Sequence, residues 1–226
     1  MATKAIATKA KARSAKQADL LSLIETMRWE PGKGFLRLDQ HLRRLNRSAD
    51  ALGFRSAPAD LVKQLEAAVS GEAPLHVRLA MTFRGNVEIT TEPFAAIADD
   101  TVWRIRIAET RLPSDDPMYR HKTTRREIYD TARAEFAEDD AQEVIMLNER
   151  GEICEGTTTN IFVEQPDGTL ITPAISCGLI AGILRGDLIR EGRAKSGLVK
   201  PQELTGARLF VGNSLRGLIR AELVEA

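Results

Sequence analysis

Hydrophobic and polar positions in the first half of the chain predict strands and two amphipathic helices. The apolar stretch Leu20 to Trp29, the turn at 30–34 and the short segment 35–38 together have the pattern of a hairpin. The next apolar positions recur at spacings of three, four and three and make one helix face, which Gly53 ends: Leu42, Leu45, Ala49 and Leu52. The remaining predicted elements of this half are a helix and three strands: 58–69, then 75–83, 87–94 and 102–109.

The second half alternates strands with helices after a proline-containing segment. Residues 111–120 hold two prolines and an Asp-Asp pair, which is the composition of an interdomain linker. Thr123 or Thr124 can cap a helix that runs to about Glu138. A glycine-bearing loop precedes a further helix, and the other apolar runs are strand segments: loop 177–182, helix 183–194, strands 143–149, 159–165, 169–173, 207–214 and 218–225.

This succession of elements predicts an α+β protein in two lobes. We expect a small α+β domain over 19–110, a linker over 111–120 and a larger domain over 121–226. The first residues, 1–18, contain five basic residues and no acid, which favours a basic disordered tail. The same composition occurs in organellar transit peptides, so that interpretation stays open.

Composition narrows the class of protein. Of 226 residues, 43% are hydrophobic and 28% charged, as in soluble globular proteins. The 32 basic and 32 acidic residues give a formal net charge of zero, so we expect neither nucleic acid nor a membrane as a partner. Cys154 and Cys177 do not suggest a disulfide framework, which favours a reducing compartment, the cytoplasm.

Four stretches carry residues suited to chemistry, and the first surrounds Lys122. No histidine or cysteine cluster has the spacing of metal ligands, and no Ser-His-Asp, Walker or dinucleotide motif occurs. Arg120, Arg125 and Arg126 stand close to Lys122, and neighbouring cations favour the neutral amine that attacks a carbonyl to form a Schiff base. A basic run is also the ordinary composition of a solvated surface, so both interpretations stay open at this point.

The second stretch is GEICEGTTTNIFVE, in which Glu155 lies between two strands. Threonine hydroxyls and backbone amides of 156–159 could hold this carboxylate in a pocket, where it would suit a protonated heterocyclic nitrogen. The competing interpretation is a solvated acid in a hairpin turn.

The other two stretches carry groups that bind anions. In CGLIAGILRG a loop enters a helix, where free backbone N–H groups and the helix dipole favour phosphate. In HLRRLNRSADALGF, Arg43, Arg44 and Arg47 flank the apolar face, and one of them could reach inward as a bidentate phosphate clamp. Such helix starts are mostly structural and such arginines mostly face water, so neither stretch is specific alone.

Taken in order, these stretches resemble the fold-type IV pyridoxal-phosphate enzymes, which include branched-chain aminotransferases, D-amino-acid aminotransferases and 4-amino-4-deoxychorismate lyases. The resemblance covers nearly all of 20–220 and is carried by these motifs: IETMRW, HLRRLNRSADALGF, HKTTRREIYD, EGTTTNIFV, LITPAISCGLIAGILRG and GNSLRG. It implies a two-lobed α+β fold with pyridoxal 5'-phosphate between the lobes, a small amino substrate and a homodimer.

The resemblance also assigns roles to residues. Lys122 matches the lysine that holds the cofactor aldehyde and then moves the α-proton as general acid–base. Glu155 matches the carboxylate that faces the pyridine nitrogen, and Arg44 matches the phosphate arginine of a His-x-x-Arg-Leu pattern. The other implied phosphate contacts lie at the helix entry and at a late polar pair: Gly182, Ile183, Leu184, Asn213 and Ser214.

Three departures separate the chain from the family pattern. The strand and Gly-Asp-Gly turn that usually precede the Phe-Glu-Thr segment are replaced by the basic tail and LSLIETMRW. This departure favours a trimmed small lobe, so the family's substrate and dimer contacts do not carry over directly. Leu184 stands where threonine is common, so a backbone contact survives and a hydroxyl contact does not. The late Gly-Thr-Ala-Ala stretch of branched-chain aminotransferases is absent, and GNSLRG is closer to the lyases.

The expectation is therefore an active pyridoxal-phosphate enzyme. A 4-amino-4-deoxychorismate lyase, which forms 4-aminobenzoate and pyruvate, is favoured over an aminotransferase that passes an amino group from a branched-chain or D-amino acid to a 2-oxo acid. A non-catalytic relative is the third reading, and the joint presence of Lys122, Glu155 and Arg44 argues against it. Four arginines could bind a substrate carboxylate: Arg28, Arg78, Arg84 and Arg106.

Overall fold

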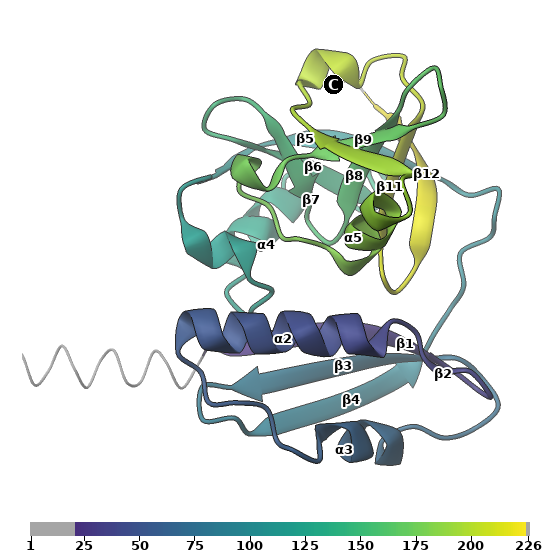
Figure 1. The fold of residues 1–226 in the computed structure, drawn as a ribbon. Coiled ribbons are helices and arrows are strands. Elements are labelled where there is room, and N and C mark those ends of the chain that lie inside the picture. Colours follow the sequence, from purple (N-terminus) through teal and green to yellow (C-terminus); the bar gives the residue numbers. More distant parts are fainter. Residues whose placement is uncertain (1–20, 225–226) are drawn as a thin grey trace, which may run out of the picture. The chain divides into compact units, whose positions relative to one another are not determined.

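The computed structural model describes residues 21–224, and the predicted tail over 1–18 lies outside them. The described chain forms two compact units, each with its own sheet and core (Figure 1). The first unit runs to Phe94 and includes the short segment Lys122–Arg125. The second unit holds Ala95–His121 and the residues from Arg126 onward. Both units combine helices with strands, which confirms the predicted α+β class.

Over its described residues, 21–94 and 122–125, the first unit is a four-stranded antiparallel sheet with strand order β2-β1-β3-β4 and two helices. Its elements are β1 Ser22–Glu30, β2 Gly34–Phe35, α2 Leu38–Leu52, α3 Leu61–Ala67, β3 Leu75–Thr82 and β4 Val87–Pro93. Alternate side chains of β1 and β3 meet both helices in one core: Leu23, Met27, Leu45, Leu65, Val77, Leu79 and Met81. Helix α2 ends at Gly53, whose φ of 71° gives the left-handed cap expected of this glycine.

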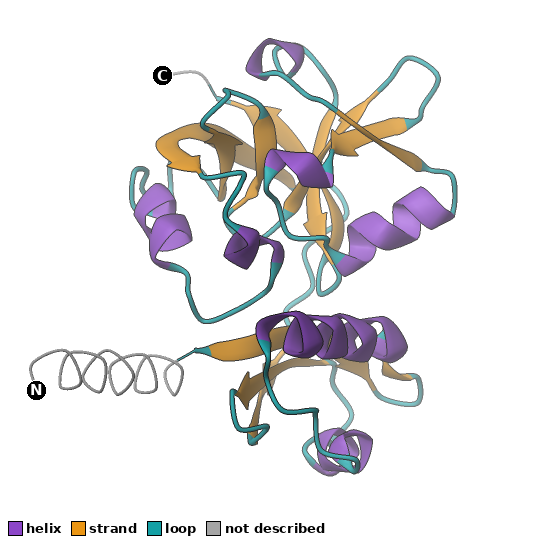
Figure 2. Cartoon of the chain, turned by 60° about the vertical axis from the view of Figure 1, so that its left-hand side comes forward, coloured by secondary structure: helices purple, strands orange, loops and turns teal. Residues whose placement is uncertain are grey.

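The second unit contains a curled sheet (Figure 2). Its eight described strands have the order β10-β9-β8-β11-β12-β5-β6-β7. Its strands are β5 Val102–Leu112, β6 Glu143–Asn148, β7 Ile153–Gly156, β8 Asn160–Glu164, β9 Leu170–Pro173, β10 Ala194–Gly197, β11 Leu209–Asn213 and β12 Gly217–Leu223. The pairs β9–β10, β5–β12 and β5–β6 are parallel, and the other pairs are antiparallel. One hydrophobic cluster draws side chains from six of these strands, so the sheet wraps around a shared core.

Helices lie in the connections of the second unit. Up to residue 224, this unit forms two α-helices and three 3-10 helices: α4 Glu127–Arg133, α5 Ile183–Arg190, η1 Pro117–Arg120, η2 Ile175–Cys177 and η3 Pro201–Glu203. Both α-helices are shorter than the sequence predicts, because α4 begins after 123–126 and α5 gives way to a turn at Gly192 and then to β10. Within residues 21–224, no helix combines the length and apolar character needed to cross a membrane.

The border between the two units differs from the predicted one. The sequence places 102–109 in the small domain and a linker at 111–120, but β5 covers Val102–Leu112 and pairs with β6 and β12 of the second unit. Ile105 and Leu112 are fully buried in that unit. Alternation identifies a strand without identifying the sheet that it joins, and the border is corrected to the Phe94–Ala95 bond.

Candidate active site

Lys122 lies at an edge of the first unit's sheet, beside β1. The Ile24 N–H donates to the Lys122 carbonyl at 2.8 Å, and Thr123 forms a bridge with Leu23. Because successive side chains alternate across a strand, Lys122 projects to the sheet face opposite Leu23 and the core. The sequence assigns Lys122 to the larger domain, whereas the structure adds it to the sheet of the first unit.

Glu25 is a buried carboxylate on the helix-covered face of the same sheet. Arg44 of α2 binds it in a bidentate manner, with Nε–Oε1 at 2.8 Å and Nη2–Oε2 at 2.6 Å, and His41 Nδ1 donates to Oε2 at 2.6 Å. Burial alone would raise the pKa of Glu25, but the charge and hydrogen bonds of Arg44, with those of His41, lower it to about 2. Arg44 therefore has a structural partner, and its contact with phosphate stays a prediction.

The Glu25 cluster predicts loss of stability in acid. A folded pKa of about 2 against an ordinary value of 4.5 stabilises the protein above pH 4.5, and this contribution is lost as the pH falls towards 2. This difference between the two pKa values corresponds to roughly 3 kcal/mol in the free energy of unfolding. Urea unfolding at a series of pH values should show this loss, and Glu25→Gln should flatten the profile in that window. An unchanged slope in the variant would contradict the assignment.

Glu155, in β7, is held by donors from three other parts of the second unit. Only 4% of the residue is exposed. Its Oε1 accepts from the Tyr129 hydroxyl at 2.8 Å and from the Ile180 N–H at 3.1 Å, and its Oε2 accepts from Asn160 Nδ2 at 3.4 Å. All three donors are neutral, so they orient the carboxylate without cancelling its charge. This arrangement suits a carboxylate that must face a cation.

The threonines after Glu155 hold a different carboxylate, Glu143 of β6. Glu143 is buried and accepts bonds from Val144 N–H at 2.9 Å, from the N–H and hydroxyl of Thr157 at 2.9 and 2.6 Å, and from those of Thr158 at 3.1 and 2.8 Å. The Thr159 hydroxyl donates as well, at 2.9 Å. The expectation that these donors hold Glu155 is corrected, because the 157–159 loop faces the start of the neighbouring strand.

The start of α5 packs against Asn160. The Asn160 Nδ2 also donates to the Ile180 carbonyl at 3.2 Å, and a Cβ on Gly182 would lie 1.9 Å from Asn160 Oδ1. Only glycine fits at this position, which is the N-cap of α5 and has no side-chain cap. The next two residues, Ile183 and Leu184, are buried and form the start of the first turn. Their backbone N–H groups are the ones that the resemblance assigns to phosphate.

The end of β11 lies beside the same elements. Asn213 Nδ2 donates to the Thr158 carbonyl at 3.3 Å. A Cβ on Gly212 would lie 3.0 Å from Leu184 Cδ2, so β11 and the start of α5 are in contact. The second unit therefore brings most of the predicted cofactor-binding residues into one region: Glu155, Gly182, Ile183, Leu184, Asn213 and Ser214. The other two, Lys122 and Arg44, belong to the first unit.

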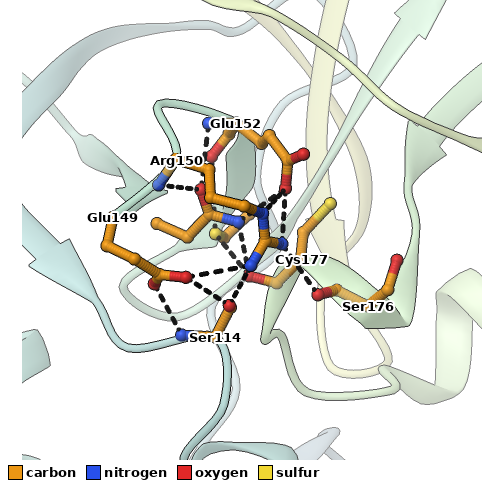
Figure 3. A network of polar contacts seen from close by, with 8 residues as sticks. Ser114, Glu149, Arg150, Glu152, Ser176 and Cys177 are labelled. Carbon is orange, nitrogen blue, oxygen red and sulfur yellow. Dashed lines mark hydrogen bonds and ion pairs between the residues drawn. The ribbon is translucent and has the colours of Figure 1, made fainter.

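A polar network fixes the segment that leads to Ile180 (Figure 3). Arg150, in the turn between β6 and β7, donates to Glu152 Oε2 at 2.6 Å, to Glu149 Oε1 at 2.9 Å and to the Ser176 carbonyl at 3.1 Å. Ser176 lies in η2, a few residues before Ile180. The network thus ties the loop that supplies one donor of Glu155 to the hairpin that carries Glu155 itself.

Three residues of this region are missed by sequence reasoning: Tyr129, Glu143 and Asn160. Asn160 lies inside the EGTTTNIFV motif, so the sequence could have indicated it as a site residue. Tyr129 contacts Glu155 across 26 residues, and Glu143 contacts Thr157 across 14. No local pattern identifies partners at such separations.

Comparisons with known proteins point to one family. The family model described as amino-transferase class IV matches residues 22–224. A Schizosaccharomyces pombe protein provisionally named aminodeoxychorismate lyase is 28% identical over 211 residues, which are 90% of each chain. A Thermotoga maritima protein provisionally named branched-chain-amino-acid aminotransferase is 30% identical over 156 residues, which are 67% of this chain and 56% of that one.

A crystal structure from Mesorhizobium loti extends the similarity to the fold. That protein, provisionally named an amino-acid aminotransferase, is 48% identical, and its structure superposes with a TM-score of 0.88. The match covers 90% of this chain and 100% of that one. The relatives thus carry both lyase and aminotransferase names.

Proposed function

Because the chain belongs to the class IV aminotransferases, a family of pyridoxal-phosphate-dependent enzymes, we propose that it is a 4-amino-4-deoxychorismate lyase that forms 4-aminobenzoate and pyruvate. One observation carries the choice of reaction: of the S. pombe and T. maritima relatives, the one with the lyase name aligns with 90% of this chain and the one with the aminotransferase name with 67%. The lyase-like GNSLRG segment supports the same choice.

The residues of the second unit fit pyridoxal 5'-phosphate as the cofactor. When bound, this group supplies the electron sink that stabilises negative charge at the substrate α-carbon. The buried Glu155 carboxylate suits a protonated ring nitrogen, because an adjacent negative charge favours the cationic form. The uncapped start of α5 suits a phosphate, since its N–H groups and dipole favour an anion and Gly182 lets the backbone approach closely.

The roles that we propose for side chains follow from their chemistry. The Lys122 amine would bind the cofactor aldehyde and, once released, would take and return the substrate α-proton. Glu155 would hold the proton on the ring nitrogen. Arg44 would contact the phosphate together with the start of α5, Asn213 and Ser214.

Among the four candidate arginines, we assign the substrate carboxylate to Arg78. Its neighbours Val77 and Leu79 are fully buried in the core, so Arg78 projects from the other face of the sheet, the face to which Lys122 projects. Within residues 21–224 Arg78 makes no ion pair, whereas Arg28 is paired with a glutamate. An unpaired guanidinium on the Lys122 face suits a carboxylate substrate.

An aminotransferase is the second candidate, and the M. loti relative favours it. Both reactions begin with removal of the α-proton by Lys122. They would separate at the next step, because the lyase would break a bond of the substrate's own side chain, whereas the aminotransferase would need a 2-oxo acid to complete its cycle.

The deciding experiment supplies aminodeoxychorismate and pyridoxal phosphate without any 2-oxo acid. We expect pyruvate and 4-aminobenzoate to appear in equal amounts and with multiple turnovers. Product that appears only after a 2-oxo acid is added would overturn the lyase assignment in favour of the aminotransferase. Absence of a cofactor absorption band in the purified protein would overturn both.

Assembly and location stay predictions. We propose a homodimer, as the resemblance implies, and a cytoplasmic location. Cys154 and Cys177 are both free and buried, which fits a reducing compartment.

A further inference from the structure

We propose that Tyr129 is a positioning residue for Glu155. The Tyr129 hydroxyl keeps the buried Glu155 carboxylate ionised, so that the cofactor ring nitrogen opposite it keeps its proton. The inference rests on the proposed function, because it explains how the assigned partner of the ring nitrogen is held and tuned. Tyr129 touches no reacting atom in this scheme and acts through Glu155.

The hydroxyl of Tyr129 is fixed in place by contacts on its ring. Tyr129 is 3% exposed and lies in α4. The Tyr119 ring packs edge-on, with centroids 6.0 Å apart and an interplanar angle of 67°, and Arg126 Cζ lies 4.8 Å from the Tyr129 centroid. Arg126 is itself held by the Thr157 carbonyl at 2.7 Å. The hydroxyl therefore meets Glu155 Oε1 at 2.8 Å with little freedom to turn away.

The direction of this hydrogen bond follows from protonation. Burial, followed by the charge of Glu155 and its hydrogen bond, raises the pKa of Tyr129 well above the ordinary value, so the phenol keeps its proton. An ionised carboxylate can only accept, and the phenol therefore donates. The Arg126 cation over the ring draws electron density from it, which strengthens the O–H as a donor.

Loss of the Tyr129 hydroxyl would shift the proton shared by Glu155 and the cofactor ring nitrogen towards Glu155. Glu155 Oε1 would keep the Ile180 N–H but lose the phenol, and a buried carboxylate with fewer donors is a stronger base. A stronger base draws the proton away from the ring nitrogen, and a neutral ring is a poorer electron sink. Titratable or charged groups near the Tyr129–Glu155 pair include Arg126, the N-cap residue of α4, with Arg185 of α5 and Cys154 of β7.

The test compares Tyr129→Phe with Thr131→Val. The first variant removes only the donor to Glu155, and the second removes a hydroxyl of the same helix that bonds to the Glu127 carbonyl. We expect kcat to fall roughly tenfold in Tyr129→Phe with little change in KM. The variant loses a hydrogen bond to the charged Glu155, and this loss affects the chemical step that follows substrate binding. Thr131→Val should match the wild type in both constants.

A second readout does not depend on turnover. In cofactor-free protein with carboxyl-labelled glutamate, NMR should show Glu155 taking up its proton at a higher pH in Tyr129→Phe than in the wild type. Fluorotyrosine, which donates more strongly and preserves the shape of the ring, should move this pH downward. Because the chain has two tyrosines, a Tyr119→Phe background confines the label to position 129.

The outcomes separate this inference from the proposed function. Wild-type protein that binds no cofactor would overturn the proposed function, and the NMR comparison would still decide whether Tyr129 sets the protonation of Glu155. Equal proton uptake in both proteins, or a kcat within twofold of the wild type in Tyr129→Phe, would overturn the inference.

Discussion

Lys122→Ala is expected to abolish turnover and leave the fold intact. Loss of a positioned acid–base group alone costs about 10²- to 10⁴-fold in rate, and loss of the covalent hold on the cofactor adds to this. The fold should survive, because the contact of Lys122 with β1 uses its backbone carbonyl, which alanine retains. The side chain is half-buried at a sheet edge and forms no part of the hydrophobic core of the first unit.

Three measurements check this result. Steady-state assays should show kcat/KM falling by at least two orders of magnitude for Lys122→Ala, while the control Lys63→Ala, at an exposed position of α3, should match the wild type. Borohydride treatment should fix the cofactor to a peptide containing Lys122 in the wild type and to no peptide of the variant. A small primary amine should restore part of the rate. Turnover within tenfold of the wild type would remove Lys122 from the mechanism.

Features set by neighbouring residues could be read from the sequence. The spacing of apolar positions identified α2, and Gly53 marked its end because glycine adopts the left-handed cap without strain. The alternation over 75–83 identified β3, which runs Leu75–Thr82. The ordered motifs indicated the family, since each reflects a local backbone geometry.

Features that depend on distant partners could not be read in the same way. Alternation showed that 102–109 is a strand but could not show that it pairs with β6 and β12. Strands β7 and β10 hold four residues each, too few for a period to appear. The carboxylate held by the 157–159 loop was misassigned for the same reason, because Glu143 and Glu155 are equally plausible acceptors until the register of the hairpin is known.

Glu143→Ala should destabilise the protein more than any other single carboxylate change in the second unit. The buried Thr157 and Thr159 hydroxyls lose their acceptor, and the exposed Thr158 loses the acceptor of its N–H and hydroxyl, whereas the Thr157 N–H keeps the Val144 carbonyl. Each buried donor left without an acceptor costs about 1–3 kcal/mol, so even partial rearrangement leaves a loss of about 3 kcal/mol or more. That is a large fraction of the 5–15 kcal/mol typical of a folded domain.

Glu143→Gln separates charge from shape at this position. The amide keeps the volume of the carboxylate but places an NH₂ donor where the loop supplies only donors, so it should recover less than half of the loss. Denaturant unfolding gives the free energies of unfolding. Glu138→Ala, at an exposed position of the same unit, should stay within about 0.5 kcal/mol of the wild type. A Glu143→Ala protein as stable as this control would show that the loop does not depend on the carboxylate.

The Glu143 variants should also bind the cofactor more weakly, for a reason that stability alone does not supply. The loop that Glu143 holds connects Glu155 to Asn160, and its Thr158 carbonyl accepts from Asn213. A loosened loop would therefore displace the groups proposed for both the ring nitrogen and the phosphate. Cofactor titration at low temperature, where Glu143→Gln is still folded, should show a dissociation constant at least about tenfold above that of the wild type. An unchanged constant would mean that the loop contributes to the fold without positioning the site.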